Sequence, residues 1–235
     1  MQKPETSIED GYNAYLQEEI ALFARRSPSE RATLDEAFAG VEISRVLDVG
    51  CGAGQEMLPF AEMTTAVCVG LDASPHVGEV GRALFLGKGY GDRVVFVRGV
   101  GESLPFGDAS FDLVICRLAL PYMDNRASIA EMARVLSPGG RLILKIHAPR
   151  FYLAMLRSRL PSLSLKQWVY PFLCMLGGTW FWVTGNQPRS GIWKGKEVFQ
   201  TQGMLREQLG KNNLRICGET PGSNRQTPSF LIIKY

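Results

Sequence analysis

The residues whose types and spacing point most directly to chemistry lie in one glycine-rich stretch, RVLDVGCGAGQ at 45–55. An apolar run leads into Gly50, Gly52 and Gly54 at alternate positions, and Asp48 stands two residues before the first of them. Glycines so placed let the backbone turn sharply and approach a ligand, with the N–H groups of the following helix facing it. The spacing differs from the G-x-G-x-x-G of dinucleotide-binding folds and therefore favours another ligand.

A second carboxylate follows the next apolar run along the chain. The stretch VGLD at 69–72 ends in Asp72, 18 residues after Gly54. An acid at the carboxyl end of the neighbouring strand accepts hydrogen bonds from ribose hydroxyls in folds of this kind. The two motifs together indicate a ligand that contains a ribose.

Such residues need a sheet that presents them along one edge. Short apolar runs alternate with helix-like stretches, and continuous apolar runs are typical of parallel strands covered on both faces. The order predicts a doubly wound α/β sheet, with SPGG at 137–140 as a turn before the fifth strand. We expect strands at 45–49, 66–71, 93–98, 111–116, 141–147, 214–219 and 229–234. We expect helices at 8–25, 29–38, 55–63, 77–88, 126–136 and 196–209.

Four stretches, in this order, resemble the class I S-adenosylmethionine-dependent methyltransferases, specifically the small-molecule branch that includes the quinone C-methyltransferases. They are LDVGCGAGQ at 47–55, VGLDASP at 69–75, GESLPFGDASFDLVICRLAL at 101–120 and EMARVLSPGGRLIL at 131–144. The resemblance implies a seven-stranded Rossmann-like sheet whose last strand inserts antiparallel. It also implies an N-terminal helical lid, a helical, aromatic insertion after the fifth strand, and S-adenosyl-L-methionine as the cofactor.

The resemblance assigns cofactor contacts to individual residues. The first motif would surround the methionine moiety, the second would hold ribose and adenine, and the third would line the adenine edge and then the methyl group. In that order the residues are Asp48, Gly50, Cys51, Gly52 and Gly54; Asp72 and Ala73; Gly101 and Glu102; Cys116 and Arg117. The family often has an aspartate at the position of Val100, where it accepts a hydrogen bond from the adenine amino group. Losing that hydrogen bond would cost about 0.5–1.5 kcal/mol of binding free energy. Glu102 or Ser103 could offset the loss.

Candidates for the acceptor side are fewer. His147 ends the expected fifth strand and is the candidate catalytic base, with a position behind the site as the alternative. Tyr12 and Tyr15 share a helix face and would either wall the acceptor pocket or pack on the core. Tyr122 would line the pocket, unless the LPYMD stretch at 120–124 only ends one element and caps the next. Arg150 would bind an acidic group of the acceptor.

Charge is unevenly distributed along the chain. The net charge is +3, yet residues 132–196 contain ten Lys or Arg and no Asp or Glu, which leaves 16 bases and 23 acids elsewhere. All four tryptophans lie in the same segment, and 167–188 carries no charge. That length matches a bilayer, but Pro171, Gly177 and Gly185 argue against a span. The alternatives are a cover over an apolar acceptor, a dimer face, or a surface that rests on a membrane.

The sequence thus predicts four parts: a helical lid at 1–40, a cofactor-binding core at 41–149, an aromatic and basic insertion over the acceptor site at 150–195, and a last helix with two strands at 196–235. Five scattered cysteines predict reduced thiols, a cytoplasmic protein and no metal site. No asparagine- or aspartate-Pro-Pro-Tyr motif follows the fourth strand, so a nucleic-acid partner is not expected. The predicted function is methyl transfer to a small apolar or aromatic molecule, with an anionic group as an option. The alternatives are a membrane-associated quinone or lipid C-methyltransferase and a non-catalytic binding protein.

Overall fold

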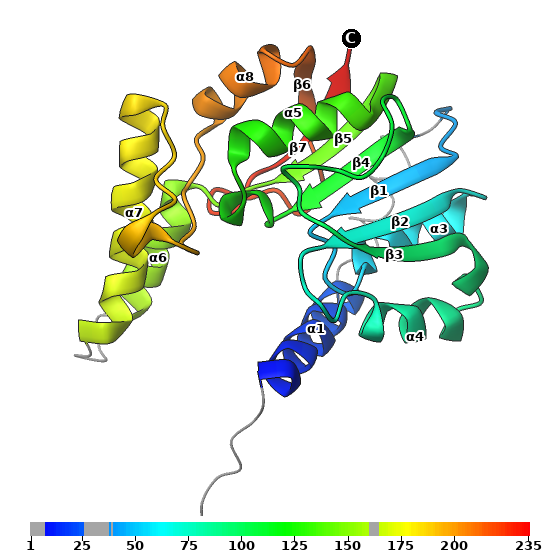
Figure 1. The fold of residues 1–235 in the computed structure, drawn as a ribbon, viewed down its shortest axis with the longest axis horizontal. Helices are drawn as coiled ribbons and strands as arrows, with labels where there is room; N and C mark the ends of the chain where they lie inside the picture. The colour runs from blue at the N-terminus through cyan, green and yellow to red at the C-terminus, as the bar shows by residue number, and fades with distance from the viewer. Residues whose placement is uncertain (1–7, 26–37, 39, 160–164) are drawn as a thin grey trace, which may run out of the picture.

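The computed structural model describes residues 8–25, 38, 40–159 and 165–235, and it contains one seven-stranded sheet (Figure 1). The strand order is β3-β2-β1-β4-β5-β7-β6. Neighbouring strands from β3 to β5 are parallel, and β7 is antiparallel to both β5 and β6. The doubly wound sheet with an antiparallel last strand is therefore confirmed.

The strands are β1 (Arg45–Val49), β2 (Val67–Asp72), β3 (Val94–Arg98), β4 (Phe111–Arg117), β5 (Leu136–Lys145), β6 (Leu214–Glu219) and β7 (Ser229–Lys234). The strand β5 begins five residues earlier than expected, because the SPGG stretch is absorbed into it as an irregularity. The pairing shifts between Phe111 and Leu113 of β4, and Gly139 adopts a φ of 75°. The predicted turn is thus a bulge inside a longer strand.

The helical elements are α1 (Ile8–Ala24), η1 (Gln55–Met57), α3 (Leu58–Met63), α4 (Glu79–Gly87), η2 (Gly91–Arg93), η3 (Leu120–Tyr122), α5 (Asn125–Val135), α6 (Pro149–Arg159), α7 (Leu165–Thr184), η5 (Gly191–Trp193) and α8 (Gln202–Gly210). The expected start of the last helix at 196 is wrong, because Thr201 accepts a hydrogen bond from the Met204 N–H and caps α8 there. The helix expected at 29–38 lies outside the described residues except for Phe38.

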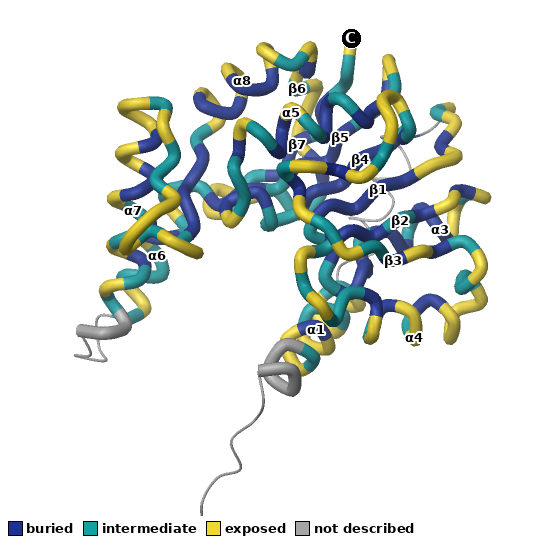
Figure 2. The backbone as a smooth tube through the Cα atoms, viewed as in Figure 1, coloured by how far each residue is buried: buried dark blue, intermediate teal, exposed yellow. Residues whose placement is uncertain are grey.

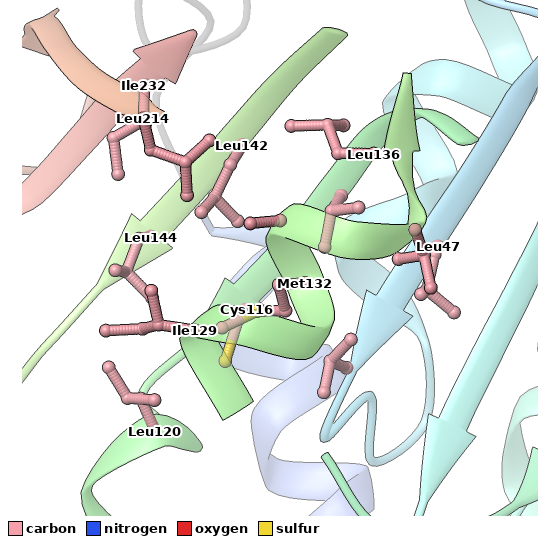
Figure 3. Packing of buried hydrophobic residues seen from close by; sticks show 14 of the residues in the cluster. Leu47, Cys116, Leu120, Ile129, Met132, Leu136, Leu142, Leu144, Leu214 and Ile232 are labelled. Carbon is pink, nitrogen blue, oxygen red and sulfur yellow. The ribbon is translucent and has the colours of Figure 1, made fainter. Parts of the chain in front are cut away.

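Two apolar layers cover the sheet. On one face Ile129 and Met132 of α5 pack against the strands together with residues of α8, and on the other face lie α3 and α4. Figure 3 shows the α5 side chains beside Cys116 and Leu144. Successive residues of β4 alternate between the layers, so Cys116 belongs to the α5 side and Ile115 to the other.

The helices α6 and α7 form a hairpin that stands apart from the helices covering the sheet (Figure 1). It has a small core of its own, built around Tyr152, Cys174 and Phe181 and closed by Val198 and Phe199 of the chain that leads back to the sheet. Among the described residues, no helix has the length and apolarity needed to cross a membrane. The hairpin is therefore a packed unit with its own contacts to the core.

Candidate functional site

A cavity of about 580 Å³ lies where the sheet order reverses between β1 and β4. The carboxyl ends of parallel strands meet at this point, and ligands of open α/β sheets bind there. The arrowheads of β1 and β2 point toward the side on which α1 lies (Figure 1). The lining comes from α1, the glycine loop, the end of β2, residues 99–102 and the segment after β4. The volume suits a ligand of nucleoside size.

The glycine loop is held tightly against the neighbouring strands. The N–H groups of Gly50 and Cys51 both donate to the carbonyl of Leu71, at 2.7 and 3.1 Å. Gly50 has a φ of 72°, and a Cβ placed on it would lie 2.3 Å from the Cβ of Ala119. Only glycine fits there, and the close approach keeps the backbone open to the cavity. Gly54, the last glycine of the loop, faces the Met57 side chain and does not line the cavity.

Asp72 is fixed at the rim of the cavity by backbone donors. Its Oδ2 accepts a hydrogen bond from the Gly52 N–H at 3.0 Å, and its Oδ1 accepts one from the Ser74 N–H at 2.9 Å. A carboxylate has about four lone-pair sites, so both oxygens can still accept from ligand hydroxyls. Ala73 follows in the same wall. This arrangement fits the ribose role that the sequence predicts for Asp72.

Asp48 presents a buried carboxyl group to the cavity. Its exposed fraction is 2%, and Oδ2 has no hydrogen-bond partner among the described residues. Burial, followed by repulsion from Glu56, raises the pKa of Asp48 well above its ordinary range, although Arg117 acts in the opposite direction. A buried acceptor without a partner is costly. A ligand that supplies a cationic donor would remove that cost.

The lining carries an excess of negative charge. Five carboxyl groups face two bases, Arg117 and Lys145, and the five belong to Glu19, Asp48, Glu56, Asp72 and Glu102. The Arg117 Nε lies 3.3 Å from Oε1 of Glu56, and both side chains are largely buried. The cavity therefore attracts a cation more strongly than an anion.

The adenine end of the predicted site consists of residues 99–102. Val100 has 47% of its surface exposed and lines the cavity with Gly101. The Oε1 of Glu102 accepts hydrogen bonds from the Asp124 N–H at 2.8 Å and from Arg189 at 3.0 Å. Glu102 thus lines the cavity while part of its acceptor capacity is already used.

Two of the predicted tyrosines lie in the wall of the cavity. Tyr15 of α1 and Tyr122 of η3 both belong to the lining, whereas the side chain of Tyr12 lies outside the described residues. Burial and the nearby Glu19 carboxylate raise the pKa of Tyr15. Asp124 instead caps α5 by accepting from the Ala127 N–H at 3.0 Å. Within the LPYMD stretch, Tyr122 therefore lines the cavity, and Asp124 caps the helix that follows.

Besides Gly54, three predicted residues lie away from the cavity lining. Cys116 faces the α5 layer, because its neighbour Arg117 takes the cavity side of β4. His147 is buried after β5, with its ring stacked on Phe151 at a centroid distance of 3.9 Å. Arg150 is the second residue of α6 and lines a separate surface cavity. The strand β5 ends at Lys145 and α6 begins at Pro149, and neither His147 nor Arg150 belongs to the cavity lining. The catalytic role of His147 and the binding role of Arg150 stay predictions.

Sequence reasoning missed Glu197, which joins the hairpin to the cavity wall. Its carboxylate is 3% exposed and accepts hydrogen bonds from His147 Nδ1 at 2.6 Å, Tyr152 at 2.8 Å and Tyr122 at 3.0 Å. Tyr170 of α7 donates a fourth. Burial opposes the charge, but the hydrogen bonds outweigh it and lower the pKa of Glu197 to about 2. The available signal was its position as the first acid after 65 residues without one, directly before the apolar pair Val198 and Phe199.

The sheet order, the glycine loop and the acid at the end of β2 define the Rossmann-like fold of methyltransferases. Residues 47–144 match the family model described as a methyltransferase domain. They therefore form an S-adenosylmethionine-dependent methyltransferase domain, as the sequence predicts.

Curated relatives and solved structures agree with this class. Over 104 residues the chain is 42% identical to an uncharacterized methyltransferase, YcgJ, of Bacillus subtilis, a match covering 44% of this chain and 40% of that protein. It is 36% identical over 118 residues to the ubiquinone/menaquinone biosynthesis C-methyltransferase UbiE of Hahella chejuensis, covering 49% and 47%. Both matches span less than half of the relative's length. The magnesium protoporphyrin IX methyltransferase of Synechocystis aligns over 100% of this chain and 90% of its own, with a TM-score of 0.58 and 20% identity.

Proposed function

We propose that the protein binds S-adenosylmethionine in the cavity and transfers its methyl group to a small apolar or aromatic acceptor. The observation that carries this proposal is Asp48, a buried carboxyl group with an unpartnered oxygen in a cavity lined by five acids. The cofactor has a sulfonium and an ammonium group, so its cationic end matches that surplus. When bound, it supplies a methyl group attached to a good leaving group.

The chain's own residues hold and orient the cofactor. Asp48 accepts hydrogen bonds from the ammonium group, Asp72 from the ribose hydroxyls, and Arg117 pairs with the carboxylate. Ala73 and Val100 give the adenine ring apolar contact. Methyl transfer is an in-line displacement, so alignment and exclusion of water supply much of the catalysis.

The acceptor is proposed to enter between Tyr15 and Tyr122. The lining holds more acids than bases, and the exposed bases of the insertion lie outside it, so an uncharged acceptor suits the cavity better than an anionic one. The Tyr122 hydroxyl in the cavity wall is oriented by its hydrogen bond to Glu197, and His147 in turn holds the Glu197 carboxylate in place. His147 would act through these two groups rather than by touching the acceptor.

A second candidate is a quinone or lipid C-methyltransferase that works beside a membrane. It is favoured by the similarity to a protein named as a quinone C-methyltransferase and by the exposed apolar residues of α7. A cytoplasmic location, a homodimer through 150–195 and a non-catalytic binding role also stay predictions.

Calorimetry with S-adenosylmethionine tests the proposal directly. We expect micromolar binding by the wild type and at least tenfold weaker binding by Asp72→Ala, because the ribose contacts are lost. Asp92→Ala, on η2 away from the cavity, is the matched control and should bind normally. Undetectable binding by the wild type, with Asp72→Ala no different, would exclude cofactor-dependent catalysis.

A further inference from the structure

One face of α7 is apolar, exposed and continuous. Val169, Phe172, Leu176, Trp180 and Val183 have exposed fractions of 47%, 54%, 45%, 56% and 72%. Their spacings of three, four, four and three residues place them in a single stripe along the helix. From first to last the stripe is about 21 Å long. We call these five residues the α7 stripe.

Among the described residues of the hairpin, the packing does not use the α7 stripe. The opposite side of α7 buries Cys174 and Phe181 in the hairpin core. A Cβ on Gly178 would lie 2.3 Å from the Phe199 ring, so this side of α7 is in close contact with the segment that contains Phe199. Figure 2 shows buried and exposed residues recurring along α7 turn by turn. Exposed apolar patches of this kind mark interaction surfaces.

The segment that contains the stripe carries charges of one sign. Arg150 and Arg157 of α6 and Lys194 after α7 are exposed, and Leu153 between the two arginines is 41% exposed. No acidic residue occurs anywhere from 132 to 196. An anionic, apolar partner is attracted by this surface and meets no repelling carboxylate of the same segment.

We infer that the α7 stripe docks on a lipid bilayer with anionic headgroups, with α7 lying in the plane of the interface. Apolar residues and tryptophan enter the headgroup region while Arg157 and Lys194 contact lipid phosphates, as in interfacial helices. A second copy of the chain fits less well. Two such faces would bring the same bases together with no acid to pair with them.

Docking would bring a membrane-dissolved acceptor close to the cavity. The hairpin is hydrogen-bonded to the cavity wall, because Tyr170 of α7 and Tyr122 of the cavity lining both donate to Glu197. The inference rests on the proposed function for the identity of the acceptor. Binding to lipid, however, needs no methyl transfer and is measured independently of it.

The test is sedimentation of the full chain with phosphatidylcholine vesicles, with and without 30% phosphatidylglycerol. We expect the wild type to bind the anionic vesicles. The affinity of the double variant Phe172→Ser/Trp180→Ser for these vesicles should be lower by about tenfold or more, because two half-exposed apolar side chains are removed. Arg157→Gln should weaken binding at low salt more than at high salt. The control is Met63→Ser/Leu86→Ser, which removes exposed apolar groups of α3 and α4 at 47% and 74% and should bind like the wild type.

Calorimetry with S-adenosylmethionine on every variant reports whether the core is folded. Docking is refuted if the wild type ignores anionic vesicles, or if the control loses as much binding as the stripe variant. A dimer in light scattering that Phe172→Ser/Trp180→Ser dissociates, without vesicle binding by the wild type, would assign the stripe to a second copy and also refute it. Vesicle binding without cofactor binding would leave docking intact and remove the proposed function.

Discussion

Replacing Glu197 by glutamine should loosen the hairpin from the core. The wild-type carboxylate accepts four hydrogen bonds from buried or half-buried donors. A hydrogen bond to a charged group contributes about 1 kcal/mol more than one to a neutral group, so four of them give about 4 kcal/mol. The donors lower the pKa of Glu197 to about 2, and a displacement of that size from an ordinary glutamate corresponds to about 3 kcal/mol by linkage. Both routes predict that Glu197→Gln lowers the free energy of unfolding by about 3–4 kcal/mol at pH 7.

The pH dependence gives the argument its sharpest test. Because the folded pKa is depressed, the contribution of Glu197 is complete above pH 5 and is lost as the pH falls toward 2. The difference in the free energy of unfolding between wild type and variant should therefore shrink by about 2 kcal/mol between pH 7 and pH 3. Without that shrinkage, the carboxylate is not held as an anion by its four donors.

The assay is urea unfolding followed by tryptophan fluorescence and by circular dichroism. All four tryptophans lie between 168 and 193, so fluorescence reports on the hairpin region and dichroism on the whole chain. Glu207→Gln removes an exposed carboxylate that lies 2.7 Å from Lys211, and it should change the stability little. A loss below about 1 kcal/mol in Glu197→Gln at pH 7 would refute the reasoning.

Three further changes have expected outcomes. Asp48→Asn should weaken S-adenosylmethionine binding in calorimetry by about tenfold or more, yet raise the melting temperature of the ligand-free protein, because burial raises the pKa of Asp48 and so disfavours its charged form in the folded state. A lower affinity together with a lower melting temperature would contradict this reasoning. Gly50→Ala should destabilise by about 2 kcal/mol or more in thermal unfolding, and Gly139→Ala, with a similar φ and nothing within 4 Å, by about 1 kcal/mol. Equal losses of stability in the two variants would mean that Ala119 can shift to make room for the new methyl group at no cost. Tyr122→Phe should lower the free energy of unfolding by about 1.5 kcal/mol and leave cofactor affinity unchanged; a tenfold weaker affinity would show that Tyr122 contacts the cofactor instead.

Several parts of the fold follow from local sequence patterns. The bounds of β1, β6 and β7 agree with the apolar runs that predict them, because such runs leave few alternatives to a covered strand. The prediction was weaker at 137–140, where a turn signal and a bulge in a long strand use the same residues. It also failed at 196–200, where chain without regular secondary structure, buried from Glu197 onward, precedes the cap at Thr201.

The sequence by itself determined the cofactor side of the site. The glycine loop, Asp48 and Asp72 belong to two adjacent strands, and a parallel sheet necessarily brings the ends of such strands to one edge. Only the tertiary structure decided what lies on the other side. The donors of Glu197 come from positions 27 to 75 residues away in the chain, and no local pattern encodes such a meeting. The basic, acid-free segment was visible in the sequence, but packing decided that Tyr170 turns inward to Glu197 while the α7 stripe stays exposed. Burial is a property of the assembled structure, and it places Tyr152 and Phe181 in the hairpin core while Phe172 and Trp180 stay exposed.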